Sequence, residues 1–216
     1  MAKVTGGEVM AAMLAAEGVD TVFGIIDGTY FGFYSALERH GIRLVSPRHE
    51  TSALHMAGAY ARLTGRVGVA MASNGPGVAN ALPGVAVEQG EGNRVLLLTS
   101  ARRTGISYPE RGGTFQYFDQ VGVIGPMSKH SQAVPSHERL PEMLRRAFRS
   151  AWDGRPGVVH VDVPEDLVNG ESPLDLDAEV RPPATYRRIG PIEPAEATVR
   201  RVADTLRSAE RPLIHA

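Results

Sequence analysis

The chain has 216 residues, of which 43% are hydrophobic and 22% charged, and its formal net charge is −1. This composition is typical of a globular protein with room for one large domain and part of another, and it gives no electrostatic reason to expect a nucleic-acid or anionic-membrane partner. The absence of cysteine excludes disulfides, thiolate metal ligands and a cysteine nucleophile, and it favours a cytoplasmic location. A membrane span needs about 18 apolar residues, and no segment of the sequence approaches that length. The N-terminal stretch MAKVTGGEVMAAMLAAEG lacks the continuous apolar core of a signal peptide.

Helix and strand patterns alternate as far as Pro164. Apolar spacing predicts helices at 5–17, with Thr5 as N-cap, and at 30–39, 50–63, 77–89 and 137–152. Short apolar runs predict strands at 21–25, 43–45, 67–72, 95–99 and 158–163, and a Gly- and Arg-rich loop is expected at 101–114. Buried strands between helices indicate an α/β fold, with a parallel sheet covered by helices on both faces.

The composition changes after Pro164. Residues 164–194 contain six prolines and little apolar periodicity, which is typical of a linker. A helix is predicted at 194–209 and the start of a strand at 211–214, too little to form a core of its own. We therefore expect a first domain at 1–168, a linker at 169–193 and the start of a truncated second domain at 194–216.

Two motifs suggest ligand sites when they are taken singly. His49-Glu50 and His55 resemble a zinc-protease motif, but the two histidines are six residues apart and not four, so no metal site is predicted. The run Gly75–Asn80 (GPGVAN) follows a strand and opens a helix, as a dinucleotide fingerprint does. Asn80 stands where that fingerprint needs a small residue, and no acidic residue follows the next strand. A nicotinamide-nucleotide site and a turn that binds nothing both remain open.

Other polar positions favour structural interpretations. Three histidines lie on separate elements without ligand spacing and are interpreted as surface or core residues: His130, His137 and His160. Asp27-Gly28 begins like a metal–diphosphate loop, but no asparagine pair follows, so a turn is expected. The loop ARRTGISYPERGG fits an anion site and a solvated loop equally well.

Several longer strings occur together and in order. They are PRHETSALHMAGAYARLTG, VGVAMASNGPGVANAL, FQYFDQVG, MSKHS and GRPGVVHVDVPEDL. Over about residues 3–168 this set resembles the N-terminal, pyrimidine-binding domain of the acetolactate synthase group of thiamine-diphosphate enzymes. Residues 190–216 resemble the opening of that family's central domain.

The resemblance implies that Glu50 is the catalytic glutamate. In this family a carboxyl group donates a hydrogen bond to N1′ of the aminopyrimidine and stabilises the imino tautomer, whose nitrogen takes the proton from the reactive thiazolium carbon. Apolar surroundings favour a carboxyl group that carries a proton because they penalise charge, and the small residues after Glu50 fit such a pocket. Taken alone, Glu50 also suits a helix start, where the helix dipole favours an acidic residue.

Further positions are implied by the same resemblance. Gly75, Pro76 and Gly77 match the family's GPG turn beside the pyrimidine, and Asn80 matches the asparagine that follows it, so with Glu50 they are the expected cofactor-binding residues. Two residues are expected at the substrate channel, namely Phe115 and Gln116. Lys129 matches a lysine for which a structural role and a binding role are equally open.

The resemblance also implies what this chain needs from elsewhere. The expected reaction is the decarboxylation and carboligation, or the cleavage, of a 2-keto acid with thiamine diphosphate and Mg²⁺. The Mg²⁺ ligands are expected on a diphosphate domain that this sequence does not contain. A homodimer, a homotetramer or a separate diphosphate-domain subunit would supply it. A non-catalytic or split-enzyme partner is the alternative. The loop Phe23–Gly28 departs from the family's FG-x-PG turn, so the substrate stays open.

Overall fold

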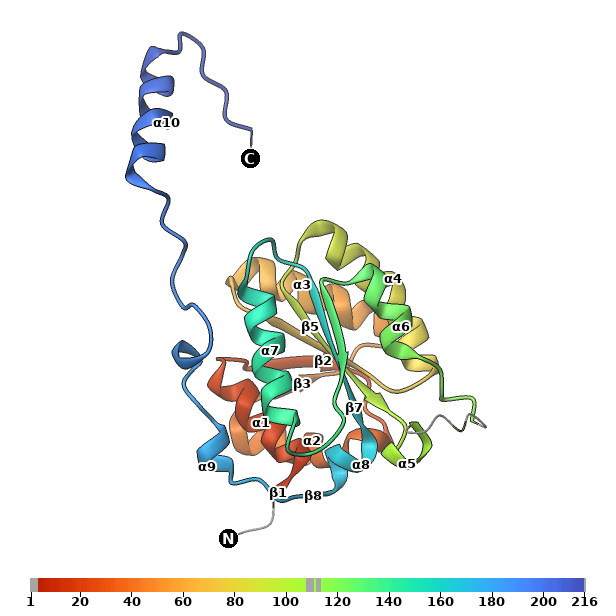
Figure 1. Cartoon of the computed structure of the whole chain (residues 1–216). Helices are drawn as coiled ribbons and strands as arrows, with labels where there is room; N and C mark the ends of the chain where they lie inside the picture. The colour runs from red at the N-terminus through yellow and green to blue at the C-terminus, as the bar shows by residue number, and fades with distance from the viewer. Residues whose placement is uncertain (1–3, 108–110, 112–113, 216) are drawn as a thin grey trace.

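The fold is built on a six-stranded parallel sheet. The computed structural model describes residues 4–107, 111 and 114–215 (Figure 1). The strands are β2 (Thr21–Gly24), β3 (Arg43–Val45), β4 (Gly68–Ala72), β5 (Val95–Ala101), β6 (His130–Ala133) and β7 (Val158–Pro164). They lie in the order β3-β2-β4-β5-β7-β6, and every neighbouring pair is parallel. The predicted α/β class with a parallel sheet is confirmed.

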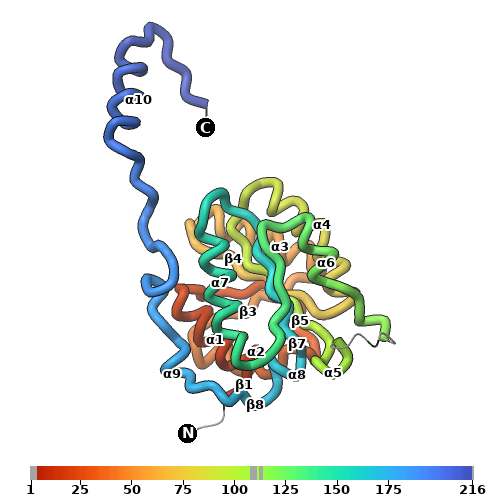
Figure 2. The backbone as a smooth tube through the Cα atoms, viewed as in Figure 1, coloured from red at the N-terminus to blue at the C-terminus, as the bar shows by residue number. Residues whose placement is uncertain are grey.

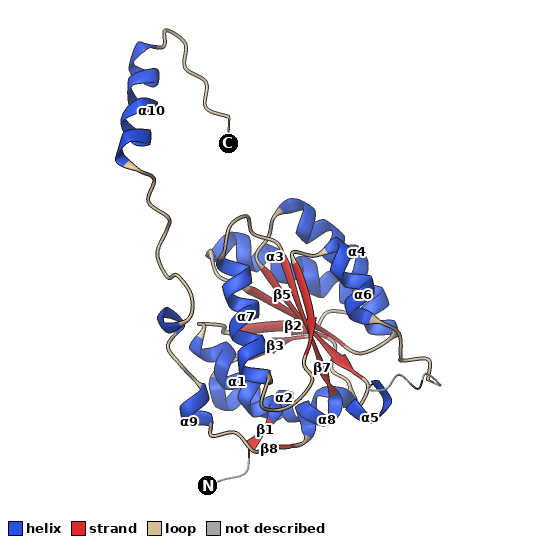
Figure 3. Ribbon diagram, viewed as in Figure 1, coloured by secondary structure: helices blue, strands red, loops and turns tan. Residues whose placement is uncertain are grey.

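Helices cover both faces of this sheet (Figure 3). One face packs against α1 (Gly6–Ala16), α2 (Phe31–Leu37), α7 (Leu140–Trp152) and α8 (Glu165–Asn169), and the other against α3 (Glu50–Thr64), α4 (Pro76–Glu91) and α6 (Gln120–Ile124). Successive residues of a strand point to opposite faces. Leu96 and Leu98 of β5 therefore join the first apolar cluster, whereas Val95 and Leu97 join the second.

Smaller elements complete the chain. A two-stranded antiparallel sheet joins β1 (Val4–Thr5) to β8 (Glu171–Ser172). The short helices are α5 (Thr104–Ser107) and α9 (Leu176–Glu179), and four 3₁₀ turns lie at Gly28–Tyr30, Glu38–His40, Gly125–Met127 and Pro183–Thr185. The predicted N-cap is confirmed, since the Thr5 side chain accepts a hydrogen bond from the Glu8 N–H at 3.1 Å. No helix in the described part of the chain is long and apolar enough to cross a bilayer.

Several local predictions differ from the structure. The strand β6 was not predicted because its sequence, HSQA, is polar and lacks an apolar alternation. Residues 211–214 form no strand, since no other described strand pairs with them. The loop predicted at 101–114 contains α5, and its residues 108–110, 112 and 113 lie outside the described residues.

The segment after Pro164 changes character along its length. Four side chains pack against the first apolar cluster, namely Leu174, Leu176, Val180 and Tyr186. Beyond them the chain leaves the sheet, and α10 (Glu196–Ser208) has no buried residue and stands apart (Figure 2). Most of the predicted linker, as far as Tyr186, thus lies on the domain, and the boundaries at 168 and 193 stay a prediction.

Candidate active site

Glu50 is the first residue of α3, directly after the loop that leaves β3. Its side chain is buried, with only 9% of the residue exposed. His49 caps the helix, because its Nδ1 accepts a hydrogen bond from the Thr51 N–H at 3.2 Å. Asn80 in the second turn of α4 donates from Nδ2 to Glu50 Oε2 at 3.1 Å. The helices α3 and α4 pack against each other through alanines and glycines, including Ala53 and Ala81, and this close packing brings the two side chains together.

The turn between β4 and α4 borders the same carboxyl group. Gly75 has φ +66° and ψ −113°, a backbone conformation that residues other than glycine rarely adopt. Pro76 occupies the first helical turn, where no N–H is needed. A Cβ on Gly77 would lie 2.5 Å from Ser73 Oγ and 3.4 Å from Glu50 Oε1. The missing side chain at Gly77 therefore lets the helix N-terminus approach the Glu50 carboxyl group.

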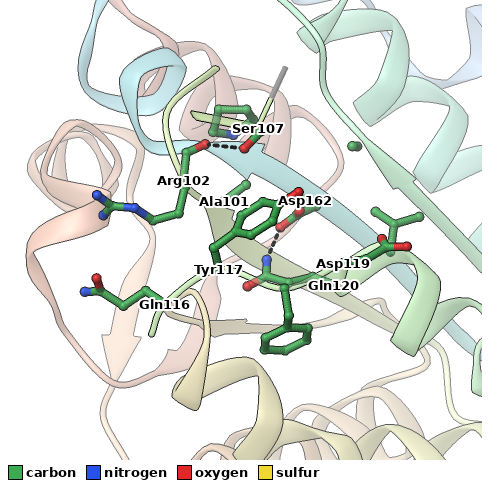
Figure 4. A pocket seen from close by; sticks show the side chains of 12 residues that line it. Ala101, Arg102, Ser107, Gln116, Tyr117, Asp119, Gln120 and Asp162 are labelled. Carbon is green, nitrogen blue, oxygen red and sulfur yellow. Dashed lines mark hydrogen bonds between the residues drawn. The ribbon is translucent and has the colours of Figure 1, made fainter. Parts of the chain in front are cut away.

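The loop before α6 lies against this turn. A Cβ on Gly75 would come within 2.5 Å of Gln116 Cα, so the two backbones are in contact. Gln116 also lines a cavity of about 270 Å³, with its amide directed away from Gln120 and Asp162 (Figure 4). Phe115 is 81% exposed. The place of Phe115 and Gln116 in a substrate channel stays a prediction.

A buried polar network lies behind the turn, and sequence reasoning missed it. Asp162 on β7 accepts hydrogen bonds at Oδ1 from Gln120 Nε2 at 2.6 Å and from Thr99 Oγ1 at 2.5 Å. Burial raises the pKa of Asp162 to about 7. An acidic residue inside the apolar run VVHVDVP was the available signal, because a charged side chain is seldom buried without partners.

The histidines have structural surroundings. His160 is fully buried, with Nε2 2.7 Å from Thr99 Oγ1 and Nδ1 2.7 Å from Ser131 Oγ. Burial lowers the pKa of His160 to about 3, so the ring is neutral and the interpretation as a core histidine is confirmed. His130 contacts Gln132.

The other candidate motifs form local structure. Asp27 accepts a hydrogen bond from the Thr29 N–H at 2.8 Å and caps the 3₁₀ turn at Gly28–Tyr30, as expected of a turn. Lys129 donates to the backbone oxygen of Asp153, and burial lowers its pKa. Arg102 lies 3.3 Å from the Glu165 carboxylate and Arg103 3.1 Å. Arg102 and Arg103, two of the three arginines in the predicted loop, are therefore paired with an acidic residue.

The described residues do not form a metal site. Within 4–107, 111 and 114–215, no cluster of three or more His, Asp or Glu side chains has the arrangement of a metal site. The histidine pair His49 and His55 is not an exception, since His49 caps α3 and His55 Nδ1 lies 2.7 Å from Glu88 Oε1.

Comparison with known proteins agrees with the resemblance. Residues 4–123 match the family described as thiamine pyrophosphate enzyme, N-terminal TPP binding domain. The chain is 33% identical over 98% of its length to a probable acetolactate synthase large subunit from Methanocaldococcus jannaschii, and covers 35% of that protein. It is 35% identical over its whole length to the acetolactate synthase isozyme 3 large subunit of Escherichia coli, and covers 37% of it. This chain thus spans about a third of the length of these relatives.

Proposed function

This chain belongs to the thiamine pyrophosphate enzymes, whose N-terminal cofactor-binding domain it contains, and we propose that it supplies the carboxyl group that activates the cofactor. The reaction is the cleavage of a 2-keto acid, with decarboxylation and transfer of the fragment to an acceptor, as the acetolactate synthase names of its relatives suggest. One observation carries the proposal: the Glu50 carboxyl group is buried and lies between the Gly75–Gly77 turn and Asn80.

The residues present fit the pyrimidine end of the cofactor. No side chain at Gly77 covers Glu50 Oε1, which lies 3.4 Å from the position that a Cβ would take. Asn80 donates to the other oxygen, Oε2, so it orients the carboxyl group and leaves Oε1 available to the cofactor. Glu50 would then donate from Oε1 to the ring nitrogen of the pyrimidine. Gly75, Pro76 and Gly77 would border the ring and exclude water from it.

The bound cofactor supplies a carbon nucleophile and an electron sink for a carbanion. Glu50 contributes by holding the proton, as a general acid–base group does, and such groups typically accelerate a reaction by about 10²–10⁴-fold. The diphosphate and Mg²⁺ require a further domain. We propose that this domain comes from another subunit, either a second copy of a longer chain or a separate polypeptide, so that the active enzyme is at least a dimer.

The test is to substitute Glu50→Gln in the complete enzyme that contains this domain and to measure exchange of the thiazolium proton by NMR. Glutamine keeps the size and can accept from Asn80, but it cannot transfer a proton. We expect exchange to slow by at least about 10²-fold. Glu88→Gln is the matched control. Glu88 is a second buried carboxyl group of the α3–α4 pair, 4% exposed, and its substitution should leave exchange unchanged.

Unaltered exchange in the Glu50→Gln enzyme would contradict the proposal. The chain would then be better interpreted as a non-catalytic partner that folds with and stabilises a related enzyme.

A further inference from the structure

The turn that borders Glu50 is held from behind by two side chains of other elements. The Gly75 N–H donates to Gln120 Oε1 at 2.9 Å, and the Asn74 N–H donates to Ser100 Oγ at 2.9 Å. Both hydrogen bonds are buried. Two consecutive peptide groups of the turn are therefore fixed by α6 and by the end of β5.

The amide of Gln120 has no freedom to reverse. Its Nε2 donates to the Ser100 backbone oxygen at 2.9 Å and to Asp162 Oδ1 at 2.6 Å, the second of which is drawn in Figure 4. A glutamine amide has two N–H donors and one carbonyl oxygen, and all of them are used. Reversal would turn the Nε2 group toward the Gly75 N–H and the oxygen toward two acceptors.

The same turn leads directly to the candidate active site. Gly75 is followed by Pro76 and Gly77 at the start of α4, and one turn later Asn80 holds the Glu50 carboxyl group at 3.1 Å. A shift of the turn would therefore move α4 and, with it, Asn80.

We propose that Gln120, backed by Asp162, is a positioning residue that fixes the Gly75 turn and thereby the Asn80–Glu50 pair. The inference rests on the proposed function for its consequence in catalysis, but the positioning itself concerns this chain alone. Gln120 touches neither Glu50 nor Asn80 in any hydrogen bond described above, so it acts through the turn.

Several titratable groups surround Asp162 and belong to the argument. Asp119, the residue that caps α6, acts on it electrostatically, as Asp162 does on the buried Tyr30 hydroxyl. His160 on the same strand shares the Thr99 hydroxyl with Asp162. Gln120 Nε2 can donate to Asp162 Oδ1 whether or not the other carboxyl oxygen carries a proton, so the anchor persists through its titration.

The test uses this 216-residue chain and needs no cofactor. Gln120→Met keeps the length of the side chain but removes its three hydrogen bonds. We expect the protection of the Gly75 amide against hydrogen exchange to fall about tenfold or more and the Asn80 side-chain N–H resonances to shift. Gln132→Met is the matched control. Gln132 is also a buried glutamine, 8% exposed, and it donates to the Met143 oxygen away from the turn. The Gln132→Met substitution should leave the Gly75 amide protection and the Asn80 side-chain resonances unchanged.

A second variant keeps the test decisive if Gln120→Met does not fold. Gln120→Glu retains the acceptor for the Gly75 N–H but places a second carboxyl group against Asp162. We expect Gly75 protection, corrected for the intrinsic exchange rate, to be near that of the unsubstituted chain at pH 5, where the pair shares a proton. It should fall about tenfold once the pH is high enough to ionise both groups, which the repulsion between them places well above the Asp162 pKa of about 7. The unsubstituted chain should show no such dependence.

Unchanged Gly75 protection and Asn80 resonances in both Gln120 variants would overturn the proposal, as would equal changes in Gln132→Met. In the complete enzyme, Gln120→Met should slow thiazolium proton exchange about tenfold, and Gln132→Met should not. If Glu50→Gln proves harmless while Gly75 still loses protection in Gln120→Met, the proposed function fails and the positioning role stands.

Discussion

At the scale of single residues, β7 buries two titratable side chains, Asp162 and His160, whose pKa values shift in opposite directions. Asp162 is buried with two donors to one carboxyl oxygen, and His160 shares the Thr99 hydroxyl with it. Burial disfavours the charged form of each group. The pKa of Asp162 therefore rises to about 7, and that of His160 falls to about 3.

These shifts predict a specific dependence of stability on pH. Between its ordinary pKa of 3.8 and about 7, Asp162 keeps its proton in the folded chain and loses it in the unfolded chain. The folded state then binds more protons, so its free energy of unfolding falls as pH rises, by about 1.4 kcal/mol per pH unit. His160 acts oppositely, since its stabilising contribution is lost as pH falls below 6.5 toward about 3.

Asp162→Asn isolates the aspartate contribution, because the amide oxygen still accepts from Gln120 and Thr99. Urea unfolding at pH 4.5, 5.5 and 6.5 should show the unsubstituted chain losing stability relative to Asp162→Asn at each step. A constant difference between the two chains across this range would show that Asp162 is already ionised when folded.

At the scale of elements, the site depends on how closely α3 and α4 approach. The first turn of α4 carries Gly77 against Ser73 and Glu50, where a Cβ has no room, whereas Gly90 near the end of the same helix has no atom within 4 Å of the position a Cβ would take. Alanine normally stabilises a helix interior relative to glycine. The two glycines of one helix should therefore respond with opposite signs.

We expect Gly77→Ala to lower the free energy of unfolding by about 1–3 kcal/mol, as overpacking does, and to weaken cofactor binding in the complete enzyme. Gly90→Ala should raise it by about 0.5–1 kcal/mol without an effect on binding. Urea unfolding and cofactor titration measure the two quantities. A Gly77→Ala chain as stable as Gly90→Ala would mean that Ser73 yields and that the close contact is not required.

At the scale of the whole molecule, a buried ion pair ties the segment after the sheet to the domain. Arg187 Nη2 lies 2.5 Å from Glu17 Oε2, with side chains 8% and 0% exposed. Tyr186 donates to the other carboxyl oxygen, and Arg187 also stacks 4.7 Å from the Trp152 ring. This connection fixes the position from which the chain leaves toward α10.

Arg187→Ala should therefore cost about 3 kcal/mol or more in urea unfolding, because it leaves the Glu17 carboxylate buried without its cation. Arg200→Ala is the contrasting control. Arg200 pairs with Glu196 on α10, but the two side chains are 74% and 78% exposed, and such a pair contributes at most about 0.5 kcal/mol. An equal loss of unfolding free energy in the two variants would mean that the Arg187–Glu17 pair is exposed to solvent.

The amino-acid pattern alone predicted five of the six strands of the parallel sheet, most of the described helices and the family. Apolar runs such as VLLLT and the spacing of 50–63 are local patterns, and local patterns predict elements because burial of one face requires them. The motifs around Glu50 and Gly75–Asn80 could also be recognised in the sequence, since each is a contiguous string.

Which of these residues meet, and what supports them, depends on the packing of elements that are distant in the chain. Glu50 and Asn80 are joined by the packing of α3 on α4, and Gly75 is held by Gln120, which lies 45 residues farther along the chain. Hydrogen bonds donated by Thr99 and Gln120 offset the cost of burying the Asp162 carboxyl group in an apolar strand. A hydrogen bond between distant segments leaves no periodic trace in either of them, so no reading of spacing reveals it. The polar strand β6 was missed for the same reason, since its neighbour β7 and not its own sequence makes it a strand.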